Sequence, residues 1–448
     1  MSMKIINTGF GINENTIRQI SKLKNEPEWM LKFRLNGYHD FEQLKIPKWG
    51  PDLSFLDFSK FIYYSKYDTT KQKKWEDLPP NIRDTFEKLH VNQEEAKYLN
   101  GLETQLDSEM VYSQVFKETA LKNVIYTDLD SAVKKYPELV QKYLGKLIHS
   151  KEHKFAALNA AVWSGGTFIY VPKNTTVNLP LHTYFRINNK NVGQFERTLI
   201  IVDDNSSLQY IEGCTAPIYS EDNLHAACVE VYVGKNAKMQ YTTVQNWSDN
   251  VLNLVTKRAK VDSYGYMSWI DGNLGSRINM KYPCTILSGE YASAECISIA
   301  VSHNNIKQDT GAKMIHTAPH TRSTIISKTI ASGNGIANYR GWVEIKKDAA
   351  NSYAHVKCDS LFLNENSKGL TYPYESIQNS TSSVEHEAYI SKLNQENMFY
   401  LTSLGIDHDT AKNLMLVGFI APFSNKLPLE YSIELNRLLE LNIDKDDD

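Results

Sequence analysis

The sequence predicts a mainly β protein, with a parallel β-helix core between helical regions at its two ends. From residue 157 to about residue 363 the chain consists of short runs rich in β-branched and aromatic residues, for example Phe168–Val171 and Val229–Val233. A polar turn followed by a small residue recurs between these runs at irregular spacings of about 21–32 residues, which suits the stacked coils of a solenoid better than the even hairpins of a sandwich. Helices of about 10–15 residues do not alternate with the strands, so a doubly wound α/β fold is disfavoured.

The recurring turn defines the extent of the predicted core, which we assign to residues 157–375. It is found at Asn205-Ser206, Asn236-Ala237, Lys257–Lys260, Gly289–Ala292, His320–Ser323 and Asp348–Asn351.

The region before the core, residues 1–156, is predicted to be mainly helical. Pro27 interrupts the first helical pattern, and Pro137 stands near the start of the last one, where proline is well tolerated. Residues 64–96, rich in Lys, Asp and Glu, are typical of a solvated linker with short helices. Apolar residues at helical spacing are found in residues 12–35, 108–121 and 136–149.

The region after the core, residues 376–448, is also predicted to be helical. Asp407 or Asp409 can cap a helix that runs to Phe419, and Pro428 can open a last helix. Two helices therefore follow the predicted solenoid.

Charge and hydropathy exclude several classes of partner. The 448 residues include 49 Lys and Arg against 52 Asp and Glu, a net charge of −3, so no basic field points to nucleic acid or to an anionic membrane. There is no apolar run of the roughly 18 residues that a membrane-spanning helix needs, and the N-terminus has no signal-peptide pattern. Five cysteines without a CxxC pair indicate thiols in a reducing compartment.

Familiar catalytic motifs are missing from the sequence. It contains no GxxxxGK[ST] phosphate loop, no GxSxG elbow and no HExxH pair. We therefore expect that the chain does not hydrolyse ATP by itself.

Two cysteines stand in suggestive surroundings. Cys214 follows Glu212-Gly213 and precedes Pro217, so a turn could expose its thiol beside a carboxylate, although a buried structural thiol is the commoner case. Cys358 lies close to Lys357, and a neighbouring cation could lower the thiol pKa and supply a thiolate that attacks sulfur or binds iron.

The other three cysteines, Cys228, Cys284 and Cys296, lie in apolar strand runs and are expected to be inert core residues.

A set of ordered motifs resembles the SufB subunits of the Suf iron-sulfur cluster assembly scaffold, over about residues 12–441. The motifs are Ser21–Met30, Gly193–Ile200, Glu212–Pro217, Thr243–Trp247, Asp309–His316, Thr324–Lys328, Tyr339–Gly341, Cys358–Ser360 and Val384–Ala388.

The resemblance implies a right-handed parallel β-helix and a role as an assembly scaffold rather than an enzyme. Its implied partners are a SufC-type ABC ATPase that docks on the C-terminal helices, a SufD-type homologous subunit or a second copy of the chain, a cysteine desulfurase with a sulfur carrier, and acceptor apoproteins. The ATP chemistry would then belong to the SufC-type subunit of the SufBCD complex. The implied location is the bacterial cytoplasm, or a plastid-like organelle.

The resemblance also implies roles for particular residues. Cys214 would accept persulfide sulfur, and Cys358 would be a ligand of a nascent iron-sulfur cluster, of the 4Fe–4S or 2Fe–2S type, with Glu387 and His386 at the same site. A passage through the β-helix between the two cysteines would be lined by Arg186, Asn188, Gln245, Trp247 and Lys257.

The residue types suit this chemistry. Arg186 and Lys257 could stabilise a polarised sulfur by charge, while Asn188 and Gln245 could donate hydrogen bonds to it and Trp247 could screen it from water. Without the resemblance, the same residues would be an ordinary polar ladder inside a solenoid.

Two other functions remain open from the sequence. The chain could be the SufD-like structural partner, which would not need the sulfur-accepting and cluster-binding residues. It could also be a carbohydrate-active β-helix enzyme, which would need a cleft with paired carboxylates and exposed aromatic residues.

Overall fold

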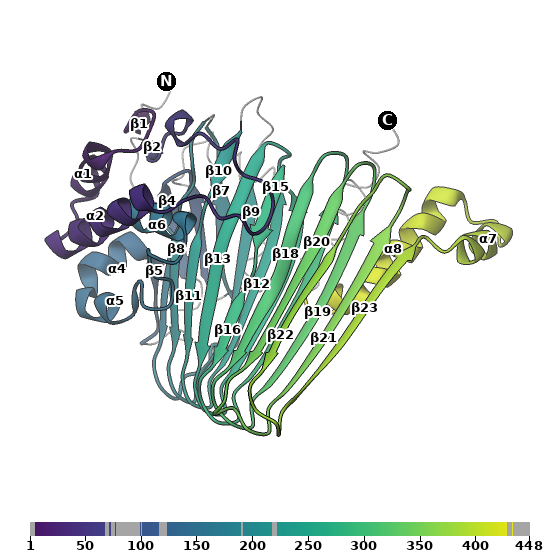
Figure 1. The fold of residues 1–448 in the computed structure, drawn as a ribbon. Coiled ribbons are helices and arrows are strands. Elements are labelled where there is room, and N and C mark those ends of the chain that lie inside the picture. The colour runs from purple at the N-terminus through teal and green to yellow at the C-terminus, as the bar shows by residue number, and fades with distance from the viewer. Residues whose placement is uncertain are drawn as a thin grey trace.

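The centre of the molecule is a β-solenoid of about eight turns, with helices at both ends (Figure 1). The computed structural model describes residues 5–67, 71–72, 77, 99, 101–115, 123–189, 191–216, 222–427 and 432. The predicted mainly β solenoid with helical flanks is confirmed.

The solenoid strands form two sheets that face each other. The first sheet has the order β4 (Glu109–Val115), β3 (Gly101–Leu106), β7 (Leu181–Arg186), β9 (Ser207–Thr215), β12 (Lys238–Trp247), β14 (Tyr266–Gly275), β17 (Ser293–Ser302), β19 (Arg322–Ala331), β21 (Tyr353–Phe362) and β23 (Ser383–Lys392), written from its N-terminal to its C-terminal end.

The second sheet follows the same direction. Its order is β5 (Ile125–Asp128), β6 (Thr167–Val171), β8 (Arg197–Val202), β11 (Cys228–Val233), β13 (Val251–Val261), β15 (Ile278–Lys281), β18 (Lys307–His316), β20 (Ile336–Ile345) and β22 (Thr371–Ile377), with the short β10 (Asn223–His225) and β16 (Cys284–Leu287) pairing beside this path. In both sheets the described strands are parallel except for the pairs β3–β4 and β5–β6 at the N-terminal end.

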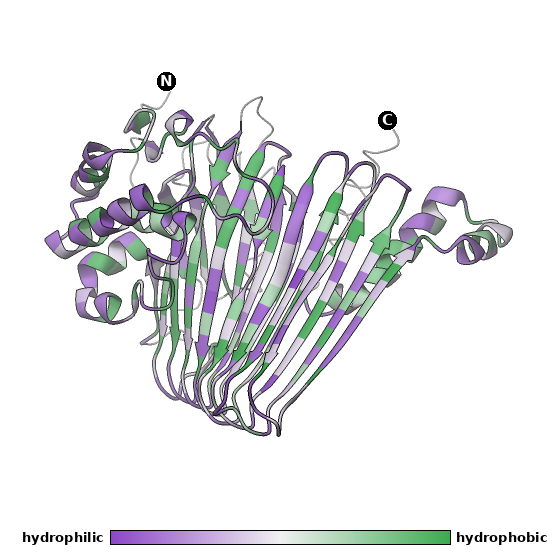
Figure 2. Cartoon of the chain, in the orientation of Figure 1, coloured by the Kyte–Doolittle hydropathy of each residue, from purple (hydrophilic) through white to green (hydrophobic). Residues whose placement is uncertain are grey.

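Parallel, in-register pairing stacks each inward side chain on its equivalent in the next turn. Tyr210, Tyr241, Trp269 and Cys296 are successive partners in the first sheet, and all four are buried between the sheets. Alternate residues face outward, so polar and apolar bands alternate along many of the strands (Figure 2). The core is therefore a column of such layers, enclosed by two sheets.

A left-handed residue marks the same turn in seven successive coils. These residues have φ between 53° and 60°, and they are Asn174, Asn205, Asn236, Tyr264, Tyr291, His320 and Asn351. The asparagine side chains bond to each other along the stack, from Asn236 to Asn205 at 3.1 Å and from Asn205 to Asn174 at 3.0 Å. The middle of the ladder is aromatic, with Tyr291 stacked between Tyr264 at 5.0 Å and His320 at 4.8 Å.

This ladder explains most of the recurrence seen in the sequence and corrects one member of it. Lys257–Lys260 lies inside β13, and the turn of that coil is at Tyr264. The error arose because a tyrosine is an unusual residue at positive φ, so Ser263-Tyr264-Gly265 did not match the Asn-based turn signal.

The N-terminal helices close the first end of the solenoid. They are α1 (Glu14–Lys24), α2 (Glu28–Gln43), α4 (Leu129–Lys135), α5 (Pro137–Tyr143) and α6 (Lys154–Val162). Pro27 separates α1 from α2 and Pro137 opens α5, as predicted. Gly37 lets α2 approach α6 closely, because a Cβ at this position would come within 2.8 Å of Ala160.

The helix predicted over residues 108–121 is wrong for the part that is described. Glu109–Val115 forms β4, which pairs antiparallel with β3 across the two-residue turn Asp107-Ser108. Asp107 adopts a φ of 51°, which favours a tight hairpin over a helix start. Residues 116–121, most of the predicted linker at 64–96 and the helix expected from Pro428 lie outside the described residues.

Two helices follow the solenoid, α7 (Gln395–Ser403) and α8 (His408–Ser424). Asp407 caps α8 by accepting from the Thr410 backbone N–H at 2.9 Å, as predicted. One side of α8 packs through Leu416 and Ile420 on the β17 region of the first sheet. The expected boundary at residue 375 falls inside β22, and the parallel strands continue to Lys392.

The helices of the described ranges are short, and the longest, α8, has 17 residues. No helix in those ranges has both the length and the apolar character that crossing a bilayer requires.

The aromatic part of the turn ladder gives a stability prediction. Tyr291→Ala loses both ring stacks and keeps a left-handed backbone that costs an L-residue about 1–2 kcal/mol, whereas Tyr291→Gly loses the stacks but removes that cost. We expect the alanine variant to be less stable than the glycine variant in urea unfolding, the reverse of the usual order in strands. Equal stability, or a less stable glycine variant, would contradict this account.

Candidate functional site

Inward-facing polar residues run along the first sheet from one end of the solenoid interior to the other. Sheet pairing aligns Glu212, Thr243, Asp271, Ser298, Ser327 and Cys358 in successive turns. We call this line the polar row. Each of its members is at least 95% buried.

Cys214 stands beside the start of the polar row. It lies within β9, not in an exposed turn as the sequence suggested, because the strand continues to Thr215 and alternation directs the thiol inward. Its Sγ donates a weak hydrogen bond to Glu212 Oε1 at 3.8 Å, so the expected thiol and carboxylate do meet. Burial, with the nearby charges of Glu212 and Glu196, raises the pKa of Cys214 well above its ordinary value.

Two buried lysines share one carboxylate at the centre of the row. Lys257 and Lys281 each place Nζ at 3.1 Å from Asp271 Oδ1. Although burial alone would raise the pKa of Asp271, the two ammonium groups hold it below its ordinary value. Burial lowers the pKa of Lys281 to about 8.

Gln245 connects these lysines to the neighbourhood of Cys214. Gln245 pairs directly with Cys214 in the sheet, and its Oε1 accepts from Lys281 Nζ at 3.2 Å and from Asn253 at 3.1 Å. The neighbourhood of Cys214 therefore includes an amide and, through it, the two ammonium groups.

Trp247 and a buried histidine form the wall on the other side of Cys214. The Trp247 ring packs in one cluster with Cys214 and lies 4.7 Å from the His225 ring. His225 bonds Glu196 and Asn253, and although burial disfavours its charged form, these partners raise its pKa. The wall thus excludes water while keeping a proton-carrying group close by.

Several buried polar atoms around this centre have no hydrogen-bond partner among the described residues. They include Gln245 Nε2, Trp247 Nε1, Asp271 Oδ2 and Glu196 Oε2. Buried polar atoms are rarely left without partners, because each costs free energy. A cluster of such unpaired atoms near Cys214 is the arrangement expected of a site that binds a small polar species.

Arg186 and Asn188 lie away from this centre. On β7, Phe185 is the partner of Cys214, so alternation sends Arg186 to the opposite face of the strand. The positive charge of Arg186 acts on Asp107, and the Asn188 backbone N–H donates to Asp107 at 2.7 Å. The structure thus brings Gln245, Trp247 and Lys257 together and leaves Arg186 and Asn188 around Asp107.

Hydroxyl groups continue the row toward the C-terminal end. Ser298 donates to Ser327 at 3.2 Å, and Ser327 is the sheet partner of Cys358. Beside them Thr329 donates to Ser360 at 2.8 Å. A polar, hydroxyl-lined track therefore leads from the lysine pair to Cys358.

Cys358 lies at the last turns of the solenoid, close to a histidine. Its Sγ is 3.9 Å from His386 Nε2, while His386 Nδ1 is 2.8 Å from Glu375. Burial raises the pKa of Cys358 to about 12. The expected lowering by Lys357 is wrong, because neighbours along a strand point to opposite faces and Lys357 is directed outward.

Glu387 lies on β23, one turn after Cys358, and on the opposite face of the sheet from the Cys358 thiol. It pairs with Lys357, whose Nζ is 3.5 Å from Glu387 Oε2. The thiol, His386 and Glu375 are therefore the metal-binding side-chain types that converge here, but across the described ranges no three His, Cys, Asp or Glu residues form a metal-binding group. One chain offers at most part of a ligand set.

The two cysteines are far apart. Five strand steps separate β9 from β21 in the first sheet, which at about 4.8 Å per step places them about 24 Å apart along the solenoid axis. A thiol at one position cannot attack sulfur held at the other.

Sequence reasoning missed several members of this network, namely Glu196, His225, Asn253, Asp271, Lys281, Ser298, Ser327 and Glu375. A signal was available, because polar residues occupy inward positions of strands such as β14 and β17, where apolar residues are expected. Using it requires knowing which face is inward.

Comparison with known proteins shows which family the chain resembles. Residues 185–419 match the model described as SUF system FeS cluster assembly, SufBD core domain, and residues 21–183 match the SufBD protein N-terminal region. An iron-sulfur cluster assembly SufBD family protein of Staphylococcus haemolyticus is 48% identical over 434 residues, covering 97% of this chain and 93% of that protein. A SufBD family protein of Staphylococcus aureus strain MRSA252 has the same identity and coverage.

The shared carboxylate of the lysine pair gives a second prediction. Asp271→Asn leaves two buried lysines without their counter-ion, and breaking a buried ion pair costs about 3–5 kcal/mol. Adding Lys281→Met should recover part of the loss, since one unpaired charge is then removed.

Urea unfolding of the single and double variants measures both effects. Asp222→Asn, which breaks a surface ion pair with Arg277, is the matched control and should lose much less. A loss for Asp271→Asn no larger than that of the control would contradict the charge assignment.

Proposed function

The chain belongs to the SufBD family of iron-sulfur cluster assembly proteins, and we propose that within this family it is the SufB-type scaffold, which receives sulfur on Cys214 and presents Cys358 to a nascent cluster. The observation that carries the proposal is the polar row, an enclosed and partly unsatisfied line of polar side chains with a thiol at each end. A SufD-like structural partner, the alternative, has no need of such a row.

In the proposed loading of sulfur onto Cys214, the neighbouring Glu212 accepts the thiol proton. The sulfane sulfur arrives as a persulfide on a carrier of the cysteine desulfurase. Cys214 passes its proton to Glu212 and its sulfur attacks the outer sulfur of the donor. The donor S–S bond breaks, the donor thiolate leaves and takes up a proton, and Cys214 becomes a persulfide.

Glu212 suits the role of proton acceptor. Burial raises the pKa of its carboxyl, which makes the carboxylate a stronger base, while Lys257 limits that rise. Tyr241 donates a hydrogen bond to the other carboxylate oxygen and fixes its orientation.

At the far end, iron and sulfur are cargo and not a resident cofactor. Cys358 and His386 offer soft and borderline ligands from inside the last turns, and Glu387 offers a carboxylate from the outer face of β23. So sparse a set favours completion by a second subunit, of the SufD type or a second copy, and later release of an iron-sulfur cluster, of the 4Fe–4S or 2Fe–2S type, to apoproteins.

The remaining partners follow from the family. A SufC-type ABC ATPase would dock at α7 and α8 and hydrolyse ATP, so this chain is a scaffold and not an enzyme. All five cysteines are free, which fits assembly in the reducing bacterial cytoplasm.

Substitution of the two cysteines is expected to block different stages of cluster assembly. Cys214→Ser should abolish persulfide loading, because a hydroxyl cannot form a persulfide. Cys358→Ser should still load sulfur but lose the cluster, since iron prefers thiolate to hydroxyl. The measurements are mass spectrometry of the loaded chain and the iron content of anaerobically purified complexes.

Cys228→Ser, which changes a buried thiol away from the polar row, is the matched control and should do both steps normally. Normal persulfide loading of Cys214→Ser would favour the structural, SufD-like subunit over the scaffold.

Glu212→Gln tests the proton transfer. The amide keeps the shape of the side chain but cannot accept the proton, so loading should slow by about 100-fold or more at neutral pH. The defect should persist as pH rises from about 6 to about 10, because burial raises the pKa of the Cys214 thiol well above its ordinary value and the thiol does not ionise without help. Rates of persulfide loading across this range measure this.

Glu295→Gln, on the outer face of β17, is the control and should leave the loading rates unchanged. Rates in Glu212→Gln equal to those of the parent would remove Glu212 from the transfer.

A further inference from the structure

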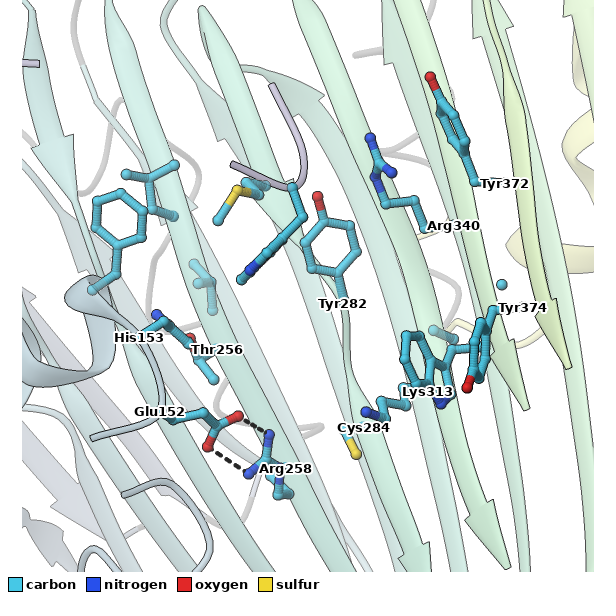
Figure 3. Close-up of a pocket in the computed structure, with 18 of the residues that line it drawn as sticks. Glu152, His153, Thr256, Arg258, Tyr282, Cys284, Lys313, Arg340, Tyr372 and Tyr374 are labelled. Carbon is cyan, nitrogen blue, oxygen red and sulfur yellow. Dashed lines mark hydrogen bonds and ion pairs between the residues drawn. The ribbon is translucent and has the colours of Figure 1, made fainter. Parts of the chain in front are cut away.

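A separate pocket of about 550 Å³ lies on the outer face of the second sheet (Figure 3). Strands from β13 to β22 form its floor. A wall is formed by residues of the N-terminal region, namely Trp49, Glu152, His153 and Phe155. Its floor residue Lys313 alternates with Ala312 and Met314, which face the solenoid interior, so the pocket and the polar row are on opposite sides of the sheet.

Flat aromatic rings line this pocket. The Trp342 and Tyr374 rings stack with centroids 3.7 Å apart and an angle of 23° between their planes. The Trp49 and Tyr282 rings meet edge to face at 5.7 Å. Trp49 is 47% and Tyr374 45% exposed, so apolar ring surface faces an open cavity of the size typical of small-molecule sites.

Among the charged groups of the pocket, Lys313 differs from the two arginines in having no carboxylate partner among the described residues. Glu152 accepts two hydrogen bonds from Arg258, and Asp309 holds Arg340 at 2.6 Å. Lys313 instead places its Nζ 4.1 Å from the Trp342 ring centroid, and no carboxylate in the described parts of the chain forms an ion pair with it.

A neutral polar group of the pocket also lacks a partner and could donate a hydrogen bond to an anion. Trp342 Nε1 is buried and has no acceptor among the described residues. Glu152, the acidic residue among those that line the pocket, already accepts from Arg258. What the pocket still offers is therefore hydrogen-bond donors and positive charge, beside flat apolar walls.

We propose that this pocket binds a small, flat, unsaturated molecule that carries an acidic group. The flat part packs between the Trp342–Tyr374 stack and the Trp49–Tyr282 pair, and the acidic group accepts from Lys313 and Trp342 Nε1. Docking of a protein segment is the other occupant that exposed rings could attract, but a concave cavity with one surplus cation fits a small anion better. The site does not depend on the function proposed for the interior.

Three probes separate the parts of this proposal. Naphthalene-1-sulfonate has both the flat body and the acid, naphthalene-1-methanol has only the flat body, and hexanesulfonate has only the acid. Titration calorimetry with the full chain should show the first binding at least about tenfold more tightly than either of the others.

The variants locate the binding. Lys313→Met keeps the length of the side chain but removes its charge, and should weaken naphthalene-1-sulfonate by about tenfold while leaving naphthalene-1-methanol unchanged. Trp342→Leu should weaken both aromatic probes. Lys238→Met, an exposed lysine at the start of β12, should change neither.

The proposal is overturned if the three probes bind alike, if Lys313→Met binds naphthalene-1-sulfonate as tightly as the parent, or if Lys238→Met weakens it equally. Unfolding curves of each variant check that the chain is folded. If no probe binds and the chain self-associates through these rings, with self-association lost in Trp342→Leu, the face is a protein contact instead.

Discussion

The pairing of equivalent residues in successive turns is the constraint on which the rest of this molecule depends. Because the strands are parallel and in register, a residue at one turn lies directly over its partner at the next, at the fixed spacing of a hydrogen-bonded sheet. A polar side chain placed inside therefore has only its row neighbours and the facing sheet as partners. Asp271 can be buried as a carboxylate because Lys257 and Lys281 reach it from the second sheet.

Because of this arrangement, buried positive and negative side chains in the interior lie close to each other and largely compensate one another. Asp271 compensates the lysines, and Glu196 compensates His225. The desolvation cost of burying these groups is offset by their mutual attraction only while all members are present, as in other buried ionic networks. Stability and chemistry are thus properties of the same set of residues.

Much of the architecture could be predicted from the sequence, and most of the failures share one cause. Pro27, Pro137 and Asp407 act locally, so their effects on helix ends were predictable. The strand β4, the outward direction of Lys357 and the separation of Glu387 from Cys358 depend on which partner a strand meets and which face is buried. Single-sequence patterns do not contain that information. That Gln245 lies beside Cys214 was expected only from the resemblance, because the residues alone do not show which strands pair.

The turn ladder has a consequence for how this chain can change in evolution. Successive left-handed residues are separated by 27 to 31 positions, and each interval contains the turns as well as the strands. A residue gained or lost in a turn leaves the faces of the following strand intact, whereas one gained or lost within β19 or β21 would rotate every later side chain of that strand to the other face. Length variation among descendants of this gene should therefore collect at the corners of the coils, and lineages that keep Cys358 inside should show none between Tyr353 and Cys358.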